Sequence, residues 1–148
     1  MASITTTSSA SAFRMQTAVS ANIAATPDVI MSLLASTQTW NSTVVSIEGE
    51  IRQGNIVRLI SALDPNRTFK LKITTATPTR LVWEDGFAPM FKGIRTFTLT
   101  PQPDGTTLFE MVEVFSGVML PLIKSSLPNF IPNFEQYAHD LKTAAEKR

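Results

Sequence analysis

The chain has 148 residues, of which 43% are hydrophobic and 17% are charged, and its formal net charge is +1. This composition is typical of a globular domain, and the balanced charge gives little electrostatic support to a role on nucleic acid or on a membrane surface. The absence of cysteine and the single histidine, His139, exclude disulfides, thiolate catalysis and metal sites built from several histidines.

The N-terminal segment, residues 1–11, is rich in serine, threonine and alanine. It lacks the basic start and apolar run of a secretory signal, so we predict a disordered tail that precedes one domain at residues 12–148. No later stretch approaches the ~20 apolar residues of a membrane span. The sequence therefore predicts a cytoplasmic protein without a membrane span.

The domain is expected to begin with a strand at residues 13–21, followed by a short helix. Thr26 is suited to cap this helix, Pro27 to occupy its first turn and Asp28 to interact with its positive end. A further short turn is expected at residues 37–40.

Six segments rich in β-branched and aromatic residues follow, separated by turn residues, and they predict an antiparallel sheet. The segments are residues 44–50, 55–63, 68–75, 80–85, 91–100 and 106–115. Both faces of the 44–63 region are apolar, so its inward face stays unassigned. The sequence then changes to a helical period, which predicts a long helix from about Pro132 to Lys147.

One helix is narrower than a sheet of six or seven strands, because neighbouring strands lie ~4.8 Å apart. A sheet with an apolar inner face must therefore curve around the helix, and side chains need not fill the space between them. The predicted class is α+β with the helix-grip arrangement: a curved antiparallel sheet of six to seven strands around a long C-terminal helix, with short helices after the first strand.

Several segments resemble the SRPBCC superfamily, which includes START lipid-binding domains and polyketide cyclase-like proteins. The resemblance is carried by IAATPDVIMSLL (23–34), TWNSTV (39–44), GEIRQGNIVRL (49–59), RLVWE (80–84), FKGIRTFTLTPQPDGTTLFEMVEVFSGVMLP (91–121) and LKTAAEK (141–147). The resemblance implies the same helix-grip fold. It also implies that a hydrophobic ligand is held between the sheet and the C-terminal helix.

The predicted apolar face of the last strands also carries charge. In the alternating pattern of these strands, Arg95 and Glu113 fall on the same face as the neighbouring phenylalanines. Asp85 falls on the inner face of the preceding strand. A hairpin closed at Asp104–Gly105 sets Phe97 near Phe109 and leaves Glu113 diagonal to Arg95. The pair is either a structural ion pair or a polar anchor for a ligand in a mostly apolar pocket.

The candidate ligand-binding residues share this inward face, the inward stripe of the last helix or the segment after the first helix. They are Trp40, Asn41, Trp83, Asp85, Phe91, Arg95, Phe97, Phe109, Met111, Glu113, Phe115, Phe134 and Tyr137. Core packing is the alternative for the tryptophans and for Tyr137. His139 is expected on a polar helix face, which argues against a serine–histidine–aspartate triad.

Two functional hypotheses follow. The first is a protein that binds a small hydrophobic molecule, such as a lipid, polyketide or terpenoid-like compound. The second is an enzyme of the cyclase, dehydratase or aldol type, without metal or cofactor, in which Glu113, Asp85 or Tyr137 moves a proton. A third alternative is a fully packed interior with a function at the surface.

Overall fold

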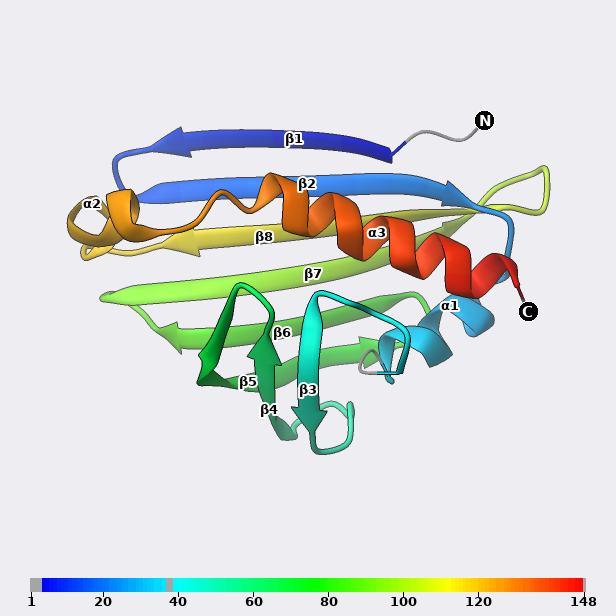
Figure 1. Ribbon diagram of the computed structural model, residues 1–148, viewed down its shortest axis with the longest axis horizontal. Coiled ribbons are helices and arrows are strands. Elements are labelled where there is room, and N and C mark those ends of the chain that lie inside the picture. Colours follow the sequence, from blue (N-terminus) through cyan, green and yellow to red (C-terminus); the bar gives the residue numbers. More distant parts are fainter. Residues whose placement is uncertain (1–3, 37–38, 148) are drawn as a thin grey trace.

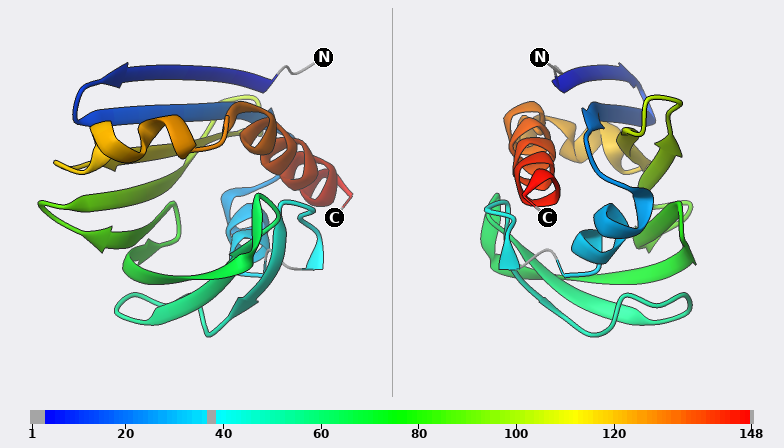
Figure 2. Two further views of the ribbon diagram at one scale, coloured as in Figure 1. Left: turned by 60° about the vertical axis from the view of Figure 1, so that its left-hand side comes forward. Right: turned by 90° about the vertical axis from the view of Figure 1, so that its right-hand side faces the viewer.

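The computed structural model describes residues 4–36 and 39–147. A single antiparallel sheet of eight strands curves around α1 (Pro27–Leu34) and the C-terminal helix α3 (Ile131–Glu146), as Figures 1 and 2 show. The strand order is β1-β2-β8-β7-β6-β5-β4-β3. The arrangement is α+β and agrees with the predicted helix-grip architecture, apart from the number of strands.

The remaining elements follow the chain closely. The strands are β1 (Ile4–Ser11), β2 (Arg14–Ile23), β3 (Val44–Glu48), β4 (Ile56–Ser61), β5 (Asp64–Thr77), β6 (Arg80–Phe87), β7 (Phe91–Pro101) and β8 (Thr107–Ser116). Two short helices, α2 (Leu120–Ile123) and η2 (Lys124–Ser126), precede α3. Both ends of α3 lie within one residue of the predicted helix at 132–147, whereas the turn expected at 37–40 lies partly outside the described residues.

The N-terminal segment is a strand, which corrects the prediction of a disordered tail for residues 4–11; residues 1–3 lie outside the described part. β1 pairs with β2 along its whole length, from Ile4 opposite Ala21 to Ser11 opposite Arg14. It is an edge strand whose serine and threonine side chains are mostly exposed. Its composition is tail-like because backbone hydrogen bonds to β2, rather than buried side chains, hold it in the sheet. The sheet therefore has eight strands instead of six or seven.

α3 packs across β1 and β2 and against α1. Its buried stripe consists of Phe134, Tyr137, Ala138, Leu141 and Ala145, at the spacing of one helical face. On the sheet, Val57 and Leu59 of β4 are buried, which assigns the inward face that the sequence left open.

The β7–β8 hairpin has a register shifted by two residues from the predicted one. Arg95 lies directly opposite Glu113, and Leu99 rather than Phe97 lies opposite Phe109. The turn is wider than a two-residue Asp104–Gly105 connection, because Gln102 N–H already donates to the carbonyl oxygen of Thr106 (2.8 Å). A shift of two preserves the face of every side chain, so the inward set is unchanged.

Within residues 4–36 and 39–147, no helix is both long and apolar enough to cross a membrane.

Candidate functional site

The predicted ion pair lies on the inner face of the sheet, on adjacent strands. Arg95 of β7 donates from Nε to Oε1 of Glu113 on β8 at 2.8 Å. The two side chains are only 17% and 11% exposed. The direct cross-strand position explains this geometry, because opposite residues of an antiparallel pair have their Cβ atoms about 5 Å apart.

Aromatic rings surround the guanidinium group. The Cζ atom of Arg95 lies 5.0 Å from the ring centre of Phe134, 5.8 Å from that of Trp83 and 6.0 Å from that of Tyr137. These separations are within the range of cation–π attraction, which is stronger where water is excluded. Two of the rings come from α3 and one from β6, so the sheet and the helix meet at this cation.

Tyr137 carries a polar atom without a partner. Its side chain is buried, and its hydroxyl forms no hydrogen bond to any described residue. Burial raises the pKa of this phenol above its usual value, and the charge of Arg95 opposes that rise. The hydroxyl is therefore a neutral donor in an apolar surrounding. Buried tyrosine hydroxyls usually find a partner, so this group needs an explanation beyond packing.

Glu113 has an altered acidity with three causes. Burial raises the pKa of its carboxyl, Arg95 lowers it through charge and a hydrogen bond, and Asp85 raises it again. Asp85 is partly buried on β6, opposite Gly93. The structure thus brings both predicted carboxylates close enough to interact electrostatically.

Gly93 makes room for this arrangement. A Cβ atom at this position would lie 3.0 Å from Cε1 of Phe115 and 3.4 Å from Oε2 of Glu113. The missing side chain lets the Phe115 ring lie against the strand beside the carboxylate. The sequence reasoning did not select this residue, although a glycine inside a strand is a signal of close approach by a neighbouring group.

A row of stacked rings leads from the pair towards the end of the molecule at which β7 begins. Phe91 stacks on Phe115 (5.6 Å between ring centres), and Phe115 stacks on Phe130 (5.2 Å). Phe130 in turn lies 6.2 Å from Phe134, the ring nearest to Arg95. Phe130 was not among the predicted site residues; its place just before α3 is the signal that could have found it.

On the other side of the ion pair, aromatic rings pack closely against one another. Trp83 meets Phe97 edge to face at 4.9 Å, and Phe97 lies 6.3 Å from Phe109. Phe97, Phe109 and Met111 have no exposed surface. These four residues, all predicted on the inward face, pack as core beneath the ion pair.

Trp40 and Asn41 lie apart from the pair. Trp40 donates from Nε1 to the carbonyl oxygen of Leu33 (2.9 Å) and meets Tyr137 edge to face at 5.8 Å. The amide of Asn41 donates to the carbonyl oxygen of Tyr137 (3.3 Å) and accepts from the backbone N–H of Thr43 (3.0 Å). The Asn41 side chain therefore joins the start of β3 to α3, and the structure gives it a structural role.

Two surface grooves accompany this interior. One of about 510 Å³ runs along α1 and α3 beside Trp40, His139 and Asp140, and one of about 430 Å³ lies beside the β7–β8 turn. Neither is lined by Arg95, Glu113 or Tyr137. The predicted binding space beside the pair is occupied by aromatic rings that touch one another, so a ligand would have to displace some of them. His139 is exposed, as expected for a polar helix face.

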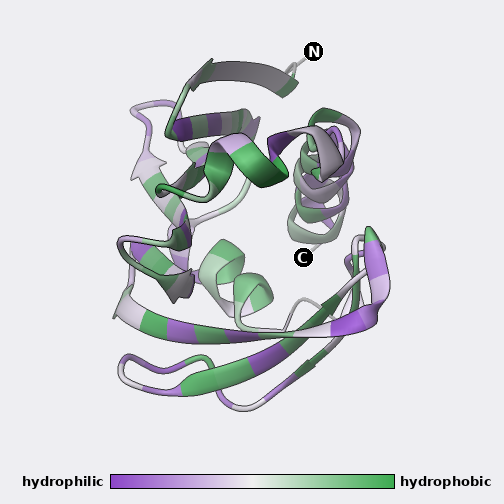
Figure 3. Cartoon of the chain, turned by 90° about the vertical axis from the view of Figure 1, so that its left-hand side faces the viewer, coloured by the Kyte–Doolittle hydropathy of each residue, from purple (hydrophilic) through white to green (hydrophobic). Residues whose placement is uncertain are grey.

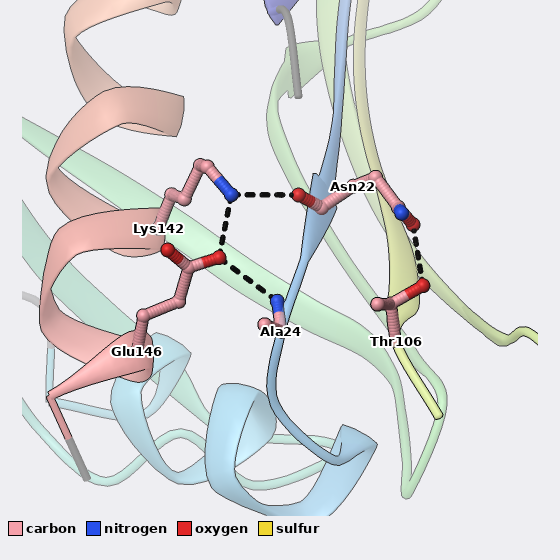
Figure 4. A network of polar contacts seen from close by, with 5 residues as sticks. All are labelled: Asn22, Ala24, Thr106, Lys142 and Glu146. Carbon is pink, nitrogen blue, oxygen red and sulfur yellow. Dashed lines mark hydrogen bonds and ion pairs between the residues drawn. The ribbon is translucent and has the colours of Figure 1, made fainter. Parts of the chain in front are cut away.

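Polar contacts fix the C-terminal end of α3 to the sheet (Figure 4). Glu146 accepts a hydrogen bond from the backbone N–H of Ala24 at 2.9 Å and pairs with Lys142. Lys142 also donates to the carbonyl oxygen of Asn22 at 3.0 Å, and the Asn22 side chain accepts from Thr106 Oγ1. Two chain segments far apart in sequence are held here by charged and polar groups.

The chain matches no family model and no curated protein, but its structure is similar to many solved ones. A START superfamily protein from Mycobacterium smegmatis has a TM-score of 0.64 and 16% identity, over 89% of this chain and 97% of that one. A protein of unknown function from Enterococcus faecalis has a TM-score of 0.67 and 20% identity, over 95% and 77%.

The di-domain ARO/CYC StfQ of the steffimycin biosynthetic pathway has a TM-score of 0.68 and 13% identity, over 92% of this chain and 52% of that one. This chain therefore spans about half of StfQ. At these identities the likeness concerns the fold alone, in which a curved antiparallel sheet encloses a C-terminal helix. The chain has a START-like helix-grip fold.

Proposed function

We propose that the protein binds a small hydrophobic molecule between the sheet and α3, with the polar end of the molecule beside Arg95 and Tyr137. The observation that carries this proposal is the buried hydroxyl of Tyr137, which has no partner among the described residues. The ring that carries it has its centre 6.0 Å from Cζ of Arg95, in the buried Arg95–Glu113 pair. A carbonyl or carboxylate oxygen would accept from both groups. A mostly apolar site with a few polar groups is the usual composition of small-molecule sites.

The geometry of Arg95 favours this assignment over a purely structural ion pair. Only its Nε forms a hydrogen bond within the described chain, to Glu113. A guanidinium has five N–H donors, and the ring centres of Phe134, Trp83 and Tyr137 lie 5.0 to 6.0 Å from its Cζ atom. A ligand oxygen would use donors that the rings cannot satisfy by hydrogen bonding.

The ligand would enter by displacement of the segment that precedes α3. The hydrogen bonds of residues 120–129 run within residues 117–131, and the Phe130 ring holds this segment through its stack on Phe115. Non-directional ring contacts can re-form on an apolar ligand. Opening at this point would uncover the row of rings that leads to Arg95.

Native mass spectrometry of the purified protein tests the proposal, by detection of a co-purified small molecule or of binding from a panel of a fatty acid, a sterol and a polycyclic aromatic ketone. We expect Arg95→Met and Tyr137→Phe to weaken the complex. Lys92→Met is the matched control, because Lys92 lies on the outer face of the same strand and pairs with Glu84. Absence of any complex, or equal weakening by Lys92→Met, would contradict the proposal and favour a packed interior.

A second candidate function is a cofactor-independent cyclase, dehydratase or aldol-type enzyme that uses the same space. It is favoured by Glu113, whose carboxyl pKa is raised by burial and by Asp85, because a carboxyl with a raised pKa is suited to proton transfer near neutral pH. Glu113→Gln should then abolish turnover but retain the ligand, whereas Glu84→Gln on the outer face should leave both turnover and ligand binding unchanged. Loss of ligand binding in Glu113→Gln, without turnover by the wild type, would argue for binding alone.

A further inference from the structure

The β1–β2 turn, the β6–β7 turn and α2 lie together at one end of the molecule, at the left of Figure 1 and facing the viewer in Figure 3. Several large apolar side chains of these segments are exposed. We name this end the apolar tip and define it by Phe13, Phe87, Met90, Val118 and Leu122. Their exposed fractions range from 41% for Met90 to 73% for Leu122. Among the described residues, the other exposed large apolar side chains are Val45, Ile56 and Leu63, which lie on or next to β3 and β4. Such a gathering on a folded protein usually marks a contact surface.

Backbone hydrogen bonds join the three segments that form the tip, which are residues 11–14, 86–91 and 116–130. Gly117 N–H donates to the carbonyl oxygen of Phe13 at 3.1 Å, Val118 N–H to that of Pro89 at 2.9 Å, and Met119 N–H to that of Met90 at 3.0 Å. Gly117 has a φ of +132°, and a Cβ atom there would lie 2.3 Å from the Met90 carbonyl oxygen. The tip is therefore one built structure rather than three independent loops.

The charge of the tip differs from that of the whole chain. The three segments that form it, residues 11–14, 86–91 and 116–130, contain no aspartate or glutamate but include Arg14 and Lys124. Neither cation forms an ion pair within the described ranges, whereas Lys92 nearby is paired with Glu84. Cations around exposed aromatic and aliphatic side chains suit an anionic, partly apolar surface.

We propose that the apolar tip docks on a phospholipid bilayer that contains anionic lipids. Phe13 of the β1–β2 turn, Phe87 at the end of β6 and Leu122 of α2 enter the interfacial region, while Arg14 and Lys124 meet the headgroups. A bilayer accepts separate projecting side chains, whereas a stable protein interface needs a continuous, complementary face. The inference goes beyond the proposed function and depends on surface residues alone, so it stands even if the interior binds no ligand.

Co-sedimentation with vesicles tests the proposal, with phosphatidylcholine mixed with phosphatidylglycerol as the probe. We expect the wild type to bind, and Phe87→Ser combined with Leu122→Ser to weaken binding by at least ~10-fold. Val45→Ser combined with Ile56→Ser is the matched control, because these side chains are 56% and 61% exposed away from the tip. This control should bind like the wild type, and circular dichroism should show that both variants are folded.

Charge supplies a second arm of the same experiment. Arg14→Gln combined with Lys124→Gln, or added salt, should weaken binding to the mixed vesicles. Absence of sedimentation by the folded wild type would overturn the proposal, as would equal loss in the Val45 and Ile56 variant. Self-association that the tip variant abolishes, without vesicle binding, would also overturn it and assign the tip to a protein partner.

Discussion

The two ends of the layer formed by α3 and the segment before it are held by different kinds of contact. At the C-terminal end, Lys142 and Glu146 bond to each other and to backbone groups of Asn22, in β2, and Ala24, just after β2. At the other end, Phe130 stacks on Phe115, and the preceding residues 120–129 bond within their own segment. Directional polar contacts fix the position of the C-terminal end on the sheet, whereas ring stacking permits several positions of the other end.

This difference indicates where the interior can open. Displacement of the C-terminal end of α3 would break charge-assisted hydrogen bonds and leave the Lys142 and Glu146 groups without partners. Displacement of residues 120–130 would break mainly apolar contacts, which a hydrophobic ligand or a bilayer can replace. The end that carries the apolar tip is also the end of the aromatic row, so docking and access to Arg95 would occur on the same side.

The largest loss of stability is expected between the two ends, at the ion pair. Arg95→Met leaves the Glu113 carboxylate buried without its partner and should lower the free energy of unfolding by about 3 kcal/mol. Urea unfolding measures this value. Lys92→Met removes a more exposed pair and should cost under about 1 kcal/mol. Equal costs would show that the inner pair is as well solvated as the outer one.

The same pair predicts a pH dependence that Glu113→Gln should remove. Folding raises the pKa of Glu113, so the folded protein binds more protons than the unfolded chain above the ordinary value of 4.5. The wild type should therefore lose stability relative to Glu113→Gln as the pH rises from 4.5 through the raised pKa. Thermal unfolding of both proteins over this range measures the difference, and parallel profiles would contradict the assignment.

Next in size is a substitution at the junction of the apolar tip. Gly117→Ala places a Cβ atom 2.3 Å from the carbonyl oxygen of Met90, and the resulting shift should cost about 2 kcal/mol. Gly105 is a control with a φ of +89° and no heavy atom within 4 Å of the added Cβ. Gly105→Ala should cost only about 1 kcal/mol. If both variants unfold at the same urea concentration, the tip is not held by this close approach.

At the anchored end, Glu146→Gln should cost about 1 kcal/mol at neutral pH. The pKa of Glu146 is lowered by its hydrogen bonds to Ala24 N–H and Lys142, so the carboxylate stabilises the fold above its ordinary value of 4.5. That contribution is lost as the pH falls through the lowered pKa. The variant should thus lose less stability than the wild type on acidification. Identical acid profiles would show that the hydrogen bonds of Glu146 do not stabilise the fold.

The smallest effect, without any change in global stability, should appear in hydrogen exchange. Backbone amides of residues 120–129 should exchange at least ~10-fold faster than those of residues 137–145, because local opening there breaks few directional contacts. Mass spectrometry of peptides from the two regions measures the ratio. Equal protection would contradict the contrast between the two ends of the layer.

The fold was largely predictable because hydrophobic alternation and helical spacing are local signals. The alternating pattern alone placed Arg95 and Glu113 on the inner face, and this placement holds although the β7–β8 register is shifted by two residues. β1 was missed because an edge strand needs little apolar character. β1 shows that backbone pairing with a neighbouring strand can order a segment whose composition is that of a disordered tail.

The site was predictable only in part, because packing between distant segments decides it. The sequence identified Tyr137 but not that its hydroxyl has no partner, and it placed Asn41 in a pocket although the amide joins β3 to α3. The roles of Gly93 and Phe130 in the site are defined by their contacts with Phe115, to which their sequence positions give only a general signal. The apolar tip likewise depends on three turns that the sequence separates widely.

The position of the two tryptophans provides an optical readout of both regions. Trp83 lies against Arg95 in the interior, and Trp40 borders the groove between α1 and α3. A Trp40→Phe variant should therefore emit only from the interior, and Trp83→Phe only from the groove. Intrinsic fluorescence of these two single-tryptophan proteins can show whether an added compound perturbs the interior, the groove or both, without any attached dye.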